Sequence, residues 1–217
     1  MVYAVMFILA LTAACPPPAD AKEIQLSAIE QLGRHLFFDK NLSDPQGQSC
    51  ATCHNPAAGW TGESSEVNAG ESVYRGARQE RSGNRKPPSA AYATQSPVFY
   101  YDRKEGDFVG GNFWDGRATG WLLGNPAAEQ AQGPFVNPVE HNMQDEKTVV
   151  EKVCNSDYAS LFRQAYGEKI CQNTIHAYNA IGQALAAFES SKEVNAFTSK
   201  YDHYLKNPGK YPLTKQE

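Results

Sequence analysis

Two cysteines and a histidine stand together at Cys50, Cys53 and His54, within the stretch SCATCHNP. Three kinds of site use thiols and an imidazole at this spacing: half of a zinc site, a redox disulfide, and a covalently attached haem. Zinc needs four ligands, and no second cysteine pair has a suitable spacing. A redox Cys-x-x-Cys is typical of a βαβ unit, which the surrounding residues do not predict. The pattern therefore favours one covalent haem c, linked through Cys50 and Cys53, with His54 as the iron ligand.

Helical periodicity is present on both sides of this motif. Ser27 to Phe38 carries apolar residues at helical spacing, and Ser27 with Glu30 forms a capping box. Asp157 and Thr174 are candidate N-caps of later helices. Further helices are predicted over residues 148–155, 157–166, 174–190 and 194–205.

A long segment between the motif and these later helices lacks periodicity. Residues 55–112 are rich in Gly, Ser, Asn and Pro and predict a loop, which needs something to organise it in a compact domain. A haem would do so. The fold class is therefore mostly α, with long haem-wrapping loops and no strand pattern of useful length.

The composition is that of a soluble globular protein. Of 217 residues, 41% are hydrophobic and 20% charged, and the formal net charge is −4. A mildly acidic chain lacks the basic face that phosphate binding requires, which argues against nucleic acid as a partner.

Residues 1–21 predict a targeting segment. The apolar run from Val2 to Ala14 is short for a bilayer span. Cleavage after Ala21 would make the segment a signal peptide, and lipidation of Cys15 would make it a lipoprotein anchor. Both alternatives predict a periplasmic or otherwise exported protein, with membrane contact only through this segment if it is retained. In such a compartment Cys154 and Cys171 form either a disulfide or two buried thiols, and the sequence leaves both open.

A second group of motifs occupies residues 113–143. FWDGRA, EQAQGP and NPVEHNM, with LGRHLFFDKNLS, the haem motif and KPPSAAYA, resemble bacterial di-haem cytochrome c peroxidases and their MauG-like relatives. The resemblance runs from about Leu32 to the end of the chain. It implies a cytochrome c-like domain that corresponds to the N-terminal half of the family's proteins, the half whose haem reacts with hydrogen peroxide.

The same resemblance implies roles for individual residues. Glu140 would be the distal acid–base carboxylate, Gln130 its hydrogen-bonding partner, and Trp114 the aromatic side chain between two haems. Electrons would come through a second haem from a small cytochrome or a cupredoxin, or from a protein substrate in the MauG-like branch.

The sequence also departs from the family pattern. No histidine lies between His54 and His141, so we expect an iron that is not capped by a loop histidine, with His141 a bystander. Lys86 occupies the slot where the family has an asparagine that binds calcium, with Asn84 two residues early, so calcium is uncertain. Met143 as an axial ligand is a weaker alternative.

The largest departure is length, because family members carry a second Cys-x-x-Cys-His domain. We expect residues 22–208 to form the peroxidase-like haem domain and 209–217 to be a linker towards an absent second haem domain. The chain is either a fragment, which we favour, or it works with a haem on another chain. The alternative functions are a single-haem electron-transfer cytochrome and an accessory cytochrome subunit of a larger complex.

Overall fold

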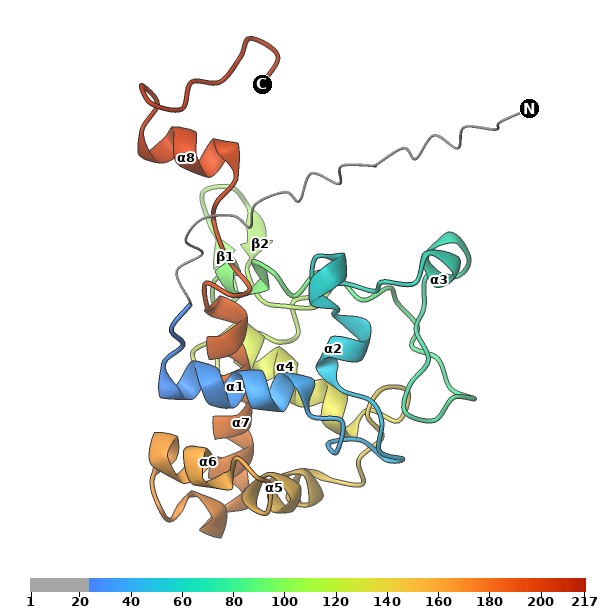
Figure 1. Cartoon of the computed structure of the whole chain (residues 1–217). Helices are drawn as coiled ribbons and strands as arrows, with labels where there is room; N and C mark the ends of the chain where they lie inside the picture. The colour runs from blue at the N-terminus through green and yellow to red at the C-terminus, as the bar shows by residue number, and fades with distance from the viewer. Residues whose placement is uncertain (1–23) are drawn as a thin grey trace, which may run out of the picture.

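The computed structural model describes residues 24–217, so the predicted targeting segment and Cys15 lie outside the described residues. The described part is mostly α-helical, as the sequence predicts, and helices surround one long central helix (Figure 1). The helices are α1 (Ala28–Phe38), α2 (Cys50–Cys53), α3 (Ser65–Ala69), α4 (Pro126–Val136), α5 (Glu146–Cys154), α6 (Ala159–Tyr166), α7 (Thr174–Ser190) and α8 (Lys200–Lys206). Short 3₁₀ turns are η1 (Pro56–Ala58), η2 (Ala93–Gln95) and η3 (Ile170–Gln172).

The central helix α7 packs against α1, α4 and α5. Two glycines allow the closest approaches: a side chain on Gly33 of α1 would collide with the carbonyl of Ala184 in α7, and a Cβ on Gly182 would lie 2.5 Å from the carbonyl oxygen of Ala128 in α4. Because backbone meets backbone at both crossings, α7 fixes α1 and α4 relative to each other. Helix α1 leads into the cysteine–histidine motif and α4 leads into Glu140, so these crossings hold together the two halves of the candidate site.

The core is aromatic where α1 and α7 meet the motif loop. Phe37, Trp60 and Phe188 pack edge to face as a triangle, with ring centroids 5.4–5.8 Å apart. Burying each such ring stabilises the fold by about 1.5–3 kcal/mol. Helix α1 starts as predicted, with the capping box of Ser27 and Glu30.

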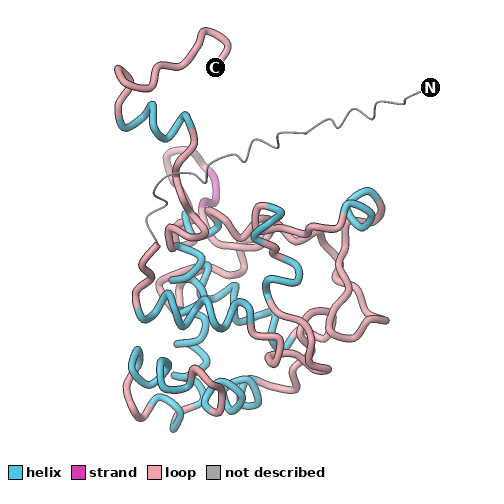
Figure 2. The backbone as a smooth tube through the Cα atoms, in the orientation of Figure 1, coloured by secondary structure: helices cyan, strands magenta, loops and turns pink. Residues whose placement is uncertain are grey.

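Residues 55–112 form the expected long loop, with short turns and little regular structure (Figure 2). Isolated bridges join Asn55 to Thr61 and Arg75 to Ser82. The sequence reading missed one small antiparallel hairpin, β1 (Tyr100–Asp102) with β2 (Asp107–Val109), in which Tyr100 pairs with Val109.

The prediction of a helix over residues 194–205 is wrong for the first half of that range. Only Lys200–Lys206 is helical, with Ser199 as its N-cap. The Asn195 side chain instead accepts from the amide of Tyr92 at 2.6 Å and donates to the Thr94 hydroxyl, so tertiary contacts hold this segment in a turn. The N-caps of α6 and α7 are Tyr158 and Asn173, each one residue from the predicted position.

A disulfide joins Cys154, at the end of α5, to Cys171 in η3. Of the two alternatives that the sequence leaves open, a disulfide or two buried thiols, the structure has the disulfide. The crosslink fastens the α5–α6 pair to the start of α7, away from the motif in the chain.

Candidate functional site

The cysteine–histidine motif forms the single turn of α2. Positions three apart on a helix share a face, so Cys50 and Cys53 lie on the same side, and the amide of His54 closes the turn on the carbonyl of Cys50 at 2.9 Å. Both thiols are unpaired, whereas Cys154 and Cys171 are bonded. Burial raises the pKa of both thiols, that of Cys53 to about 11, with nearby carboxylates adding to the effect.

These thiols do not suit the two rival chemistries of the motif. Zinc binding and disulfide exchange both use the thiolate, which the raised pKa of both thiols disfavours. Within residues 24–217 no three His, Cys, Asp or Glu side chains are grouped to hold a metal ion. Two unpaired thiols on one face with an adjacent imidazole fit a c-type haem, for which Cys50 and Cys53 would supply the thioether links.

His54 is prepared as a neutral ligand. Its Nδ1 lies 3.2 Å from the carbonyl oxygen of Trp60, which can only accept, so the proton resides on Nδ1 and Nε2 is left with its lone pair. The Trp60 carbonyl is itself fixed by the amide of Ala90 at 2.9 Å. Burial lowers the pKa of the imidazole, which favours the neutral form that binds metal.

Glu140 lies on the turn after α4 and is held from two directions. The side-chain amide of Asn137 donates to its carboxylate at 2.8 Å, and its backbone carbonyl accepts from Ala77 at 2.7 Å. Gly76 allows this contact, because a Cβ there would lie 2.5 Å from the carbonyl oxygen of Val139.

The electrostatic surroundings of Glu140 connect it to the motif. Burial raises the pKa of its carboxyl, while the bond from Asn137 and the charge of Arg117 oppose that rise. The charge of Glu140 in turn raises the pKa of Cys53. The structure therefore brings Glu140 close enough to the motif for its charge to act on Cys53.

His141 is buried and held in the core. Its Nδ1 lies 2.8 Å from the carbonyl oxygen of Leu42, its ring packs edge to face on Phe135, and it is 3% exposed. These contacts fix the ring in place, and the expectation that His141 is a bystander stays a prediction.

Gln130 and Trp114 lie in different surroundings. Gln130 is half-buried on α4, and its amide makes no hydrogen bond within the described part of the chain. Trp114 is 86% exposed, so the structure places it on the surface and not in a closed pocket with Glu140. Pro134 lies inside α4.

The loop that carries Trp114 is held by contacts within itself and by one residue of α4. Arg117 pairs with both carboxylate oxygens of Asp115 at 2.9 Å and stacks 3.8 Å over the ring of Phe113. The carboxylate of Glu129 on α4 accepts from the backbone amides of Gly120 and Leu122 at 2.8 and 2.7 Å.

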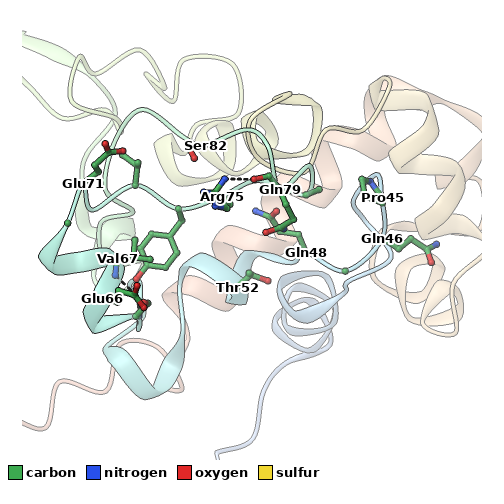
Figure 3. A pocket seen from close by; sticks show the side chains of 16 residues that line it. Pro45, Gln46, Gln48, Thr52, Glu66, Val67, Glu71, Arg75, Gln79 and Ser82 are labelled. Atoms are coloured by element: carbon green, nitrogen blue, oxygen red, sulfur yellow. Dashed lines mark hydrogen bonds between the residues drawn. The ribbon is translucent and has the colours of Figure 1, made fainter.

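A cavity of about 880 Å³ adjoins the motif on its Thr52 side (Figure 3). Gln48 and Thr52 line one wall, and the loop with Glu66, Arg75 and Gln79 lines the other. The Gln48 amide lies 3.8 Å from the sulfur of Cys53, so the cavity borders the motif. The lining contains neither the motif cysteines nor His54 or Glu140.

Sequence reasoning missed the residues that support this site. The side-chain amide of Asn137 donates to the Glu140 carboxylate. Its position three residues before Glu140, in a predicted turn, is the sequence signal that could have identified it. Trp60 fixes the His54 tautomer through its backbone carbonyl, and a backbone contact cannot be read from the type of the side chain.

Within residues 24–217, the helices are too short or too polar to cross a membrane.

Comparisons with known proteins show the family of this chain. The family described as "Di-haem cytochrome c peroxidase" matches residues 27–210. The methylamine utilization protein MauG of Paracoccus denitrificans is 35% identical over 209 residues, which cover 96% of this chain and 50% of that protein. The cytochrome c551 peroxidase of Pseudomonas aeruginosa is 29% identical over 90% of this chain and 48% of its own length.

Solved structures show the same similarity. The crystal structure of the di-haem peroxidase BthA from Burkholderia thailandensis matches with a TM-score of 0.73 and 30% identity, over 87% of this chain and 44% of that one. The chain thus spans about half the length of the relatives it matches. It belongs to the di-haem cytochrome c peroxidase family.

Proposed function

We propose that this chain is the peroxidatic half of a di-haem cytochrome c peroxidase or MauG-like oxidoreductase. The observation that carries the proposal is Glu140, a largely buried carboxyl with a raised pKa whose charge reaches Cys53 of the haem motif. Cys50, Cys53 and His54 would hold one c-type haem, which supplies an iron centre that binds hydrogen peroxide and passes electrons to it.

The chain's own residues would handle the protons. Breaking the O–O bond heterolytically requires a proton to move from the inner to the outer peroxide oxygen. Glu140 would accept and return that proton, and a partly apolar setting suits it because it brings the carboxyl pKa closer to neutrality. The amide of Gln130, unengaged within the described residues, would donate a hydrogen bond to the peroxide. In sum, one hydrogen peroxide, two electrons and two protons give two waters.

Electrons would arrive past Trp114. Its exposed indole suits a position against a second haem, on a further domain or on another chain, that is fed by a cytochrome, a cupredoxin or a protein substrate. The disulfide between Cys154 and Cys171 supports an exported protein, because disulfides persist outside the cytoplasm. Calcium has no supporting observation at Lys86, which is exposed.

The test begins with the haem content of the purified chain, by mass and by pyridine haemochrome, followed by rapid mixing with hydrogen peroxide. We expect one covalent haem and a fast spectral change that slows about 10²–10⁴-fold in Glu140→Gln. Glu151→Gln is the matched control, because Glu151 is exposed and pairs only with Lys147 at 3.6 Å. A colourless protein would refute the proposal, as would a Glu140→Gln variant whose spectral change with hydrogen peroxide is as fast as that of the control.

The alternative of a plain electron carrier is tested by exogenous ligands. An iron with two protein ligands resists cyanide and carbon monoxide, whereas a vacant position binds both. The lack of a histidine between His54 and His141 favours the vacant position. An accessory subunit held by residues 1–21 would require detergent for its extraction.

A further inference from the structure

Asn142 ends the turn that carries Glu140, and the peroxide chemistry described above does not use its side chain. It belongs to the motif NPVEHNM. Its backbone has a φ of 59°, in the left-handed region that favours glycine and that asparagine adopts more readily than most other residues. Residues in this region persist where their surroundings hold them, and they gather at functional sites. The side-chain contacts of Asn142 show what holds it.

The side-chain amide of Asn142 joins two segments that lie far apart in the chain. Its Nδ2 donates to the carbonyl of Asp44 at 2.7 Å, and its Oδ1 accepts from the guanidinium of Arg81 at 3.1 Å. A carbonyl only accepts and a guanidinium only donates, so the amide satisfies both partners in one orientation alone. The two contacts therefore form a specific tie and not a chance encounter on the surface.

The first partner belongs to the segment that enters the haem motif. The backbone amide of Asp44 donates to the carbonyl of His141 at 2.9 Å, so the segment and the turn are joined twice. One residue earlier, the Ser43 hydroxyl accepts from the backbone amide of Gln48 at 3.0 Å. The Gln48 side chain in turn lies 3.8 Å from the sulfur of Cys53. A continuous series of contacts thus leads from the Glu140 turn to the motif.

The second partner belongs to a narrow loop, which we call the Arg81 loop and which is closed where the amide of Gly76 donates to the carbonyl of Arg81 at 2.9 Å. The Arg81 guanidinium also donates to the carbonyl of Pro138 at 3.4 Å. From the same loop the amide of Ala77 donates to the backbone carbonyl of Glu140 at 2.7 Å. The Arg81 loop therefore holds the turn on both sides of Glu140.

These contacts divide the placement of Glu140 between two asparagines. Asn137 holds the carboxylate within its own turn, and Asn142 holds the turn against the Arg81 loop and the segment that enters the motif. Proton transfer depends steeply on position, and a misplacement of about 1 Å can slow a reaction about 10²-fold. The tie at Asn142 is thus in a position to control the rate.

We propose that Asn142 is a positioning residue for Glu140, and that its side-chain amide keeps the Glu140 carboxylate at its working place beside the haem motif. The inference rests on the function proposed above, in which Glu140 moves the proton of the peroxide. Asn142 carries no proton in that reaction, and its effect passes through Glu140. Removing the amide must therefore slow the reaction only in a protein that has Glu140.

The experiment uses Asn142→Gly in the haem-loaded protein, because glycine adopts the left-handed backbone without strain while the amide is lost. We expect the reaction with hydrogen peroxide to slow about tenfold or more. Binding of carbon monoxide to the reduced haem should not change, because it involves no proton transfer. Asn155→Gly is the matched control, since that exposed side chain bonds only to the carbonyl of Glu151 at 2.8 Å. It should react as the wild type does.

A double-mutant comparison separates positioning from a general loss of structure. In the Glu140→Gln background, Asn142→Gly should change the rate by less than about twofold, because residues that act as one unit are not additive. Hydrogen–deuterium exchange measures the tie itself and requires no turnover. Backbone amides of residues 74–83 and 137–143 should exchange about fivefold faster or more in Asn142→Gly, because two hydrogen bonds are lost.

An Asn142→Gly variant that reacts at the wild-type rate would overturn the inference, as would an equal slowing with and without Glu140 or an unchanged exchange pattern. If Asn142→Gly fails to fold, Arg81→Ala removes an exposed side chain and one of the two contacts of the amide. It must slow the reaction in the wild type and not in Glu140→Gln. A Glu140→Gln variant as fast as the wild type would instead refute the proposed function, which keeps the two failures distinct.

Discussion

The burial of Glu189 predicts an unusual dependence of stability on pH. Its pKa of about 8 in the folded protein compares with an ordinary value of 4.5. Between these two pH values, each pH unit lowers the free energy of unfolding by about 1.4 kcal/mol, because the carboxyl ionises in the unfolded chain but not in the folded one. The stability contributed by the protonated form is thus complete below about pH 4.5 and is lost as the pH rises through about 8. The total loss is of the order of 5 kcal/mol.

Replacing the acid with its amide should remove this dependence. We expect the unfolding free energy of Glu189→Gln, relative to the wild type, to increase by about 2.5 kcal/mol between pH 5 and 7 and by about 4 kcal/mol between pH 5 and 9. Equilibrium unfolding of the haem-loaded protein by guanidinium, at each pH and with the disulfide intact, measures it. Glu193→Gln should differ from the wild type by less than about 1 kcal/mol throughout, because its ion pair with Arg34 at 3.0 Å is partly exposed and such pairs contribute little. Parallel curves for Glu189→Gln and the wild type would show that Glu189 is solvated or paired, and the reasoning would fail.

Three further outcomes test other parts of the structure. Replacing Cys154 and Cys171 with serine opens a crosslink of 17 residues' separation and should lower the unfolding free energy by about 3 kcal/mol, measured by denaturant titration. Gly33→Ala forces apart the closest approach of α1 and α7 and should destabilise by about 2 kcal/mol, whereas Gly209→Ala, whose Cβ would meet nothing closer than 3.8 Å, should be neutral in thermal melts. The rate of reaction with peroxide should fall at acid pH as Glu140 is protonated, with an apparent pKa above its ordinary 4.5, and this limb should vanish in Glu140→Gln.

Local signals predicted those elements whose residues act through their neighbours in the chain. The capping box at Ser27 and the apolar stripe of α7 are of this kind, and both are present. Helix α4 was missed because Gly133 and Pro134 look like loop residues, although Pro126 at the first turn and the cap at Asn125 are start signals visible in the sequence. The Pro134 nitrogen cannot donate, so α4 lacks one helical hydrogen bond near its end.

Long-range contacts decided the elements that local signals could not predict. Asn195 reads as part of a helix, but its side chain bonds to residues about a hundred positions earlier, and this arrangement outweighs helical propensity. The candidate site divides in the same way. The spacing of Cys50, Cys53 and His54 predicts the chemistry of the motif from the sequence. The hydrogen bond from Asn137 to Glu140 and the burial of Glu189 arise only in the folded chain, so the sequence could not predict them. The roles of Glu140, Gln130 and Trp114 stay predictions.

The two buried carboxyls differ in what opposes their burial, and this difference assigns them different tasks. Glu140 has a hydrogen bond from Asn137 and the charge of Arg117 to favour its ionised form, and its pKa rises only moderately. Glu189 has neither, and its pKa rises to about 8. At neutral pH Glu140 is therefore the easier of the two to ionise and can accept a proton, while Glu189 already holds one. Environments that push two carboxyl pKa values apart are how a protein keeps a base and an acid at one pH. If Asn137→Ala left the pH profile of the peroxide reaction unchanged, this division between Glu140 and Glu189 would lose its physical basis.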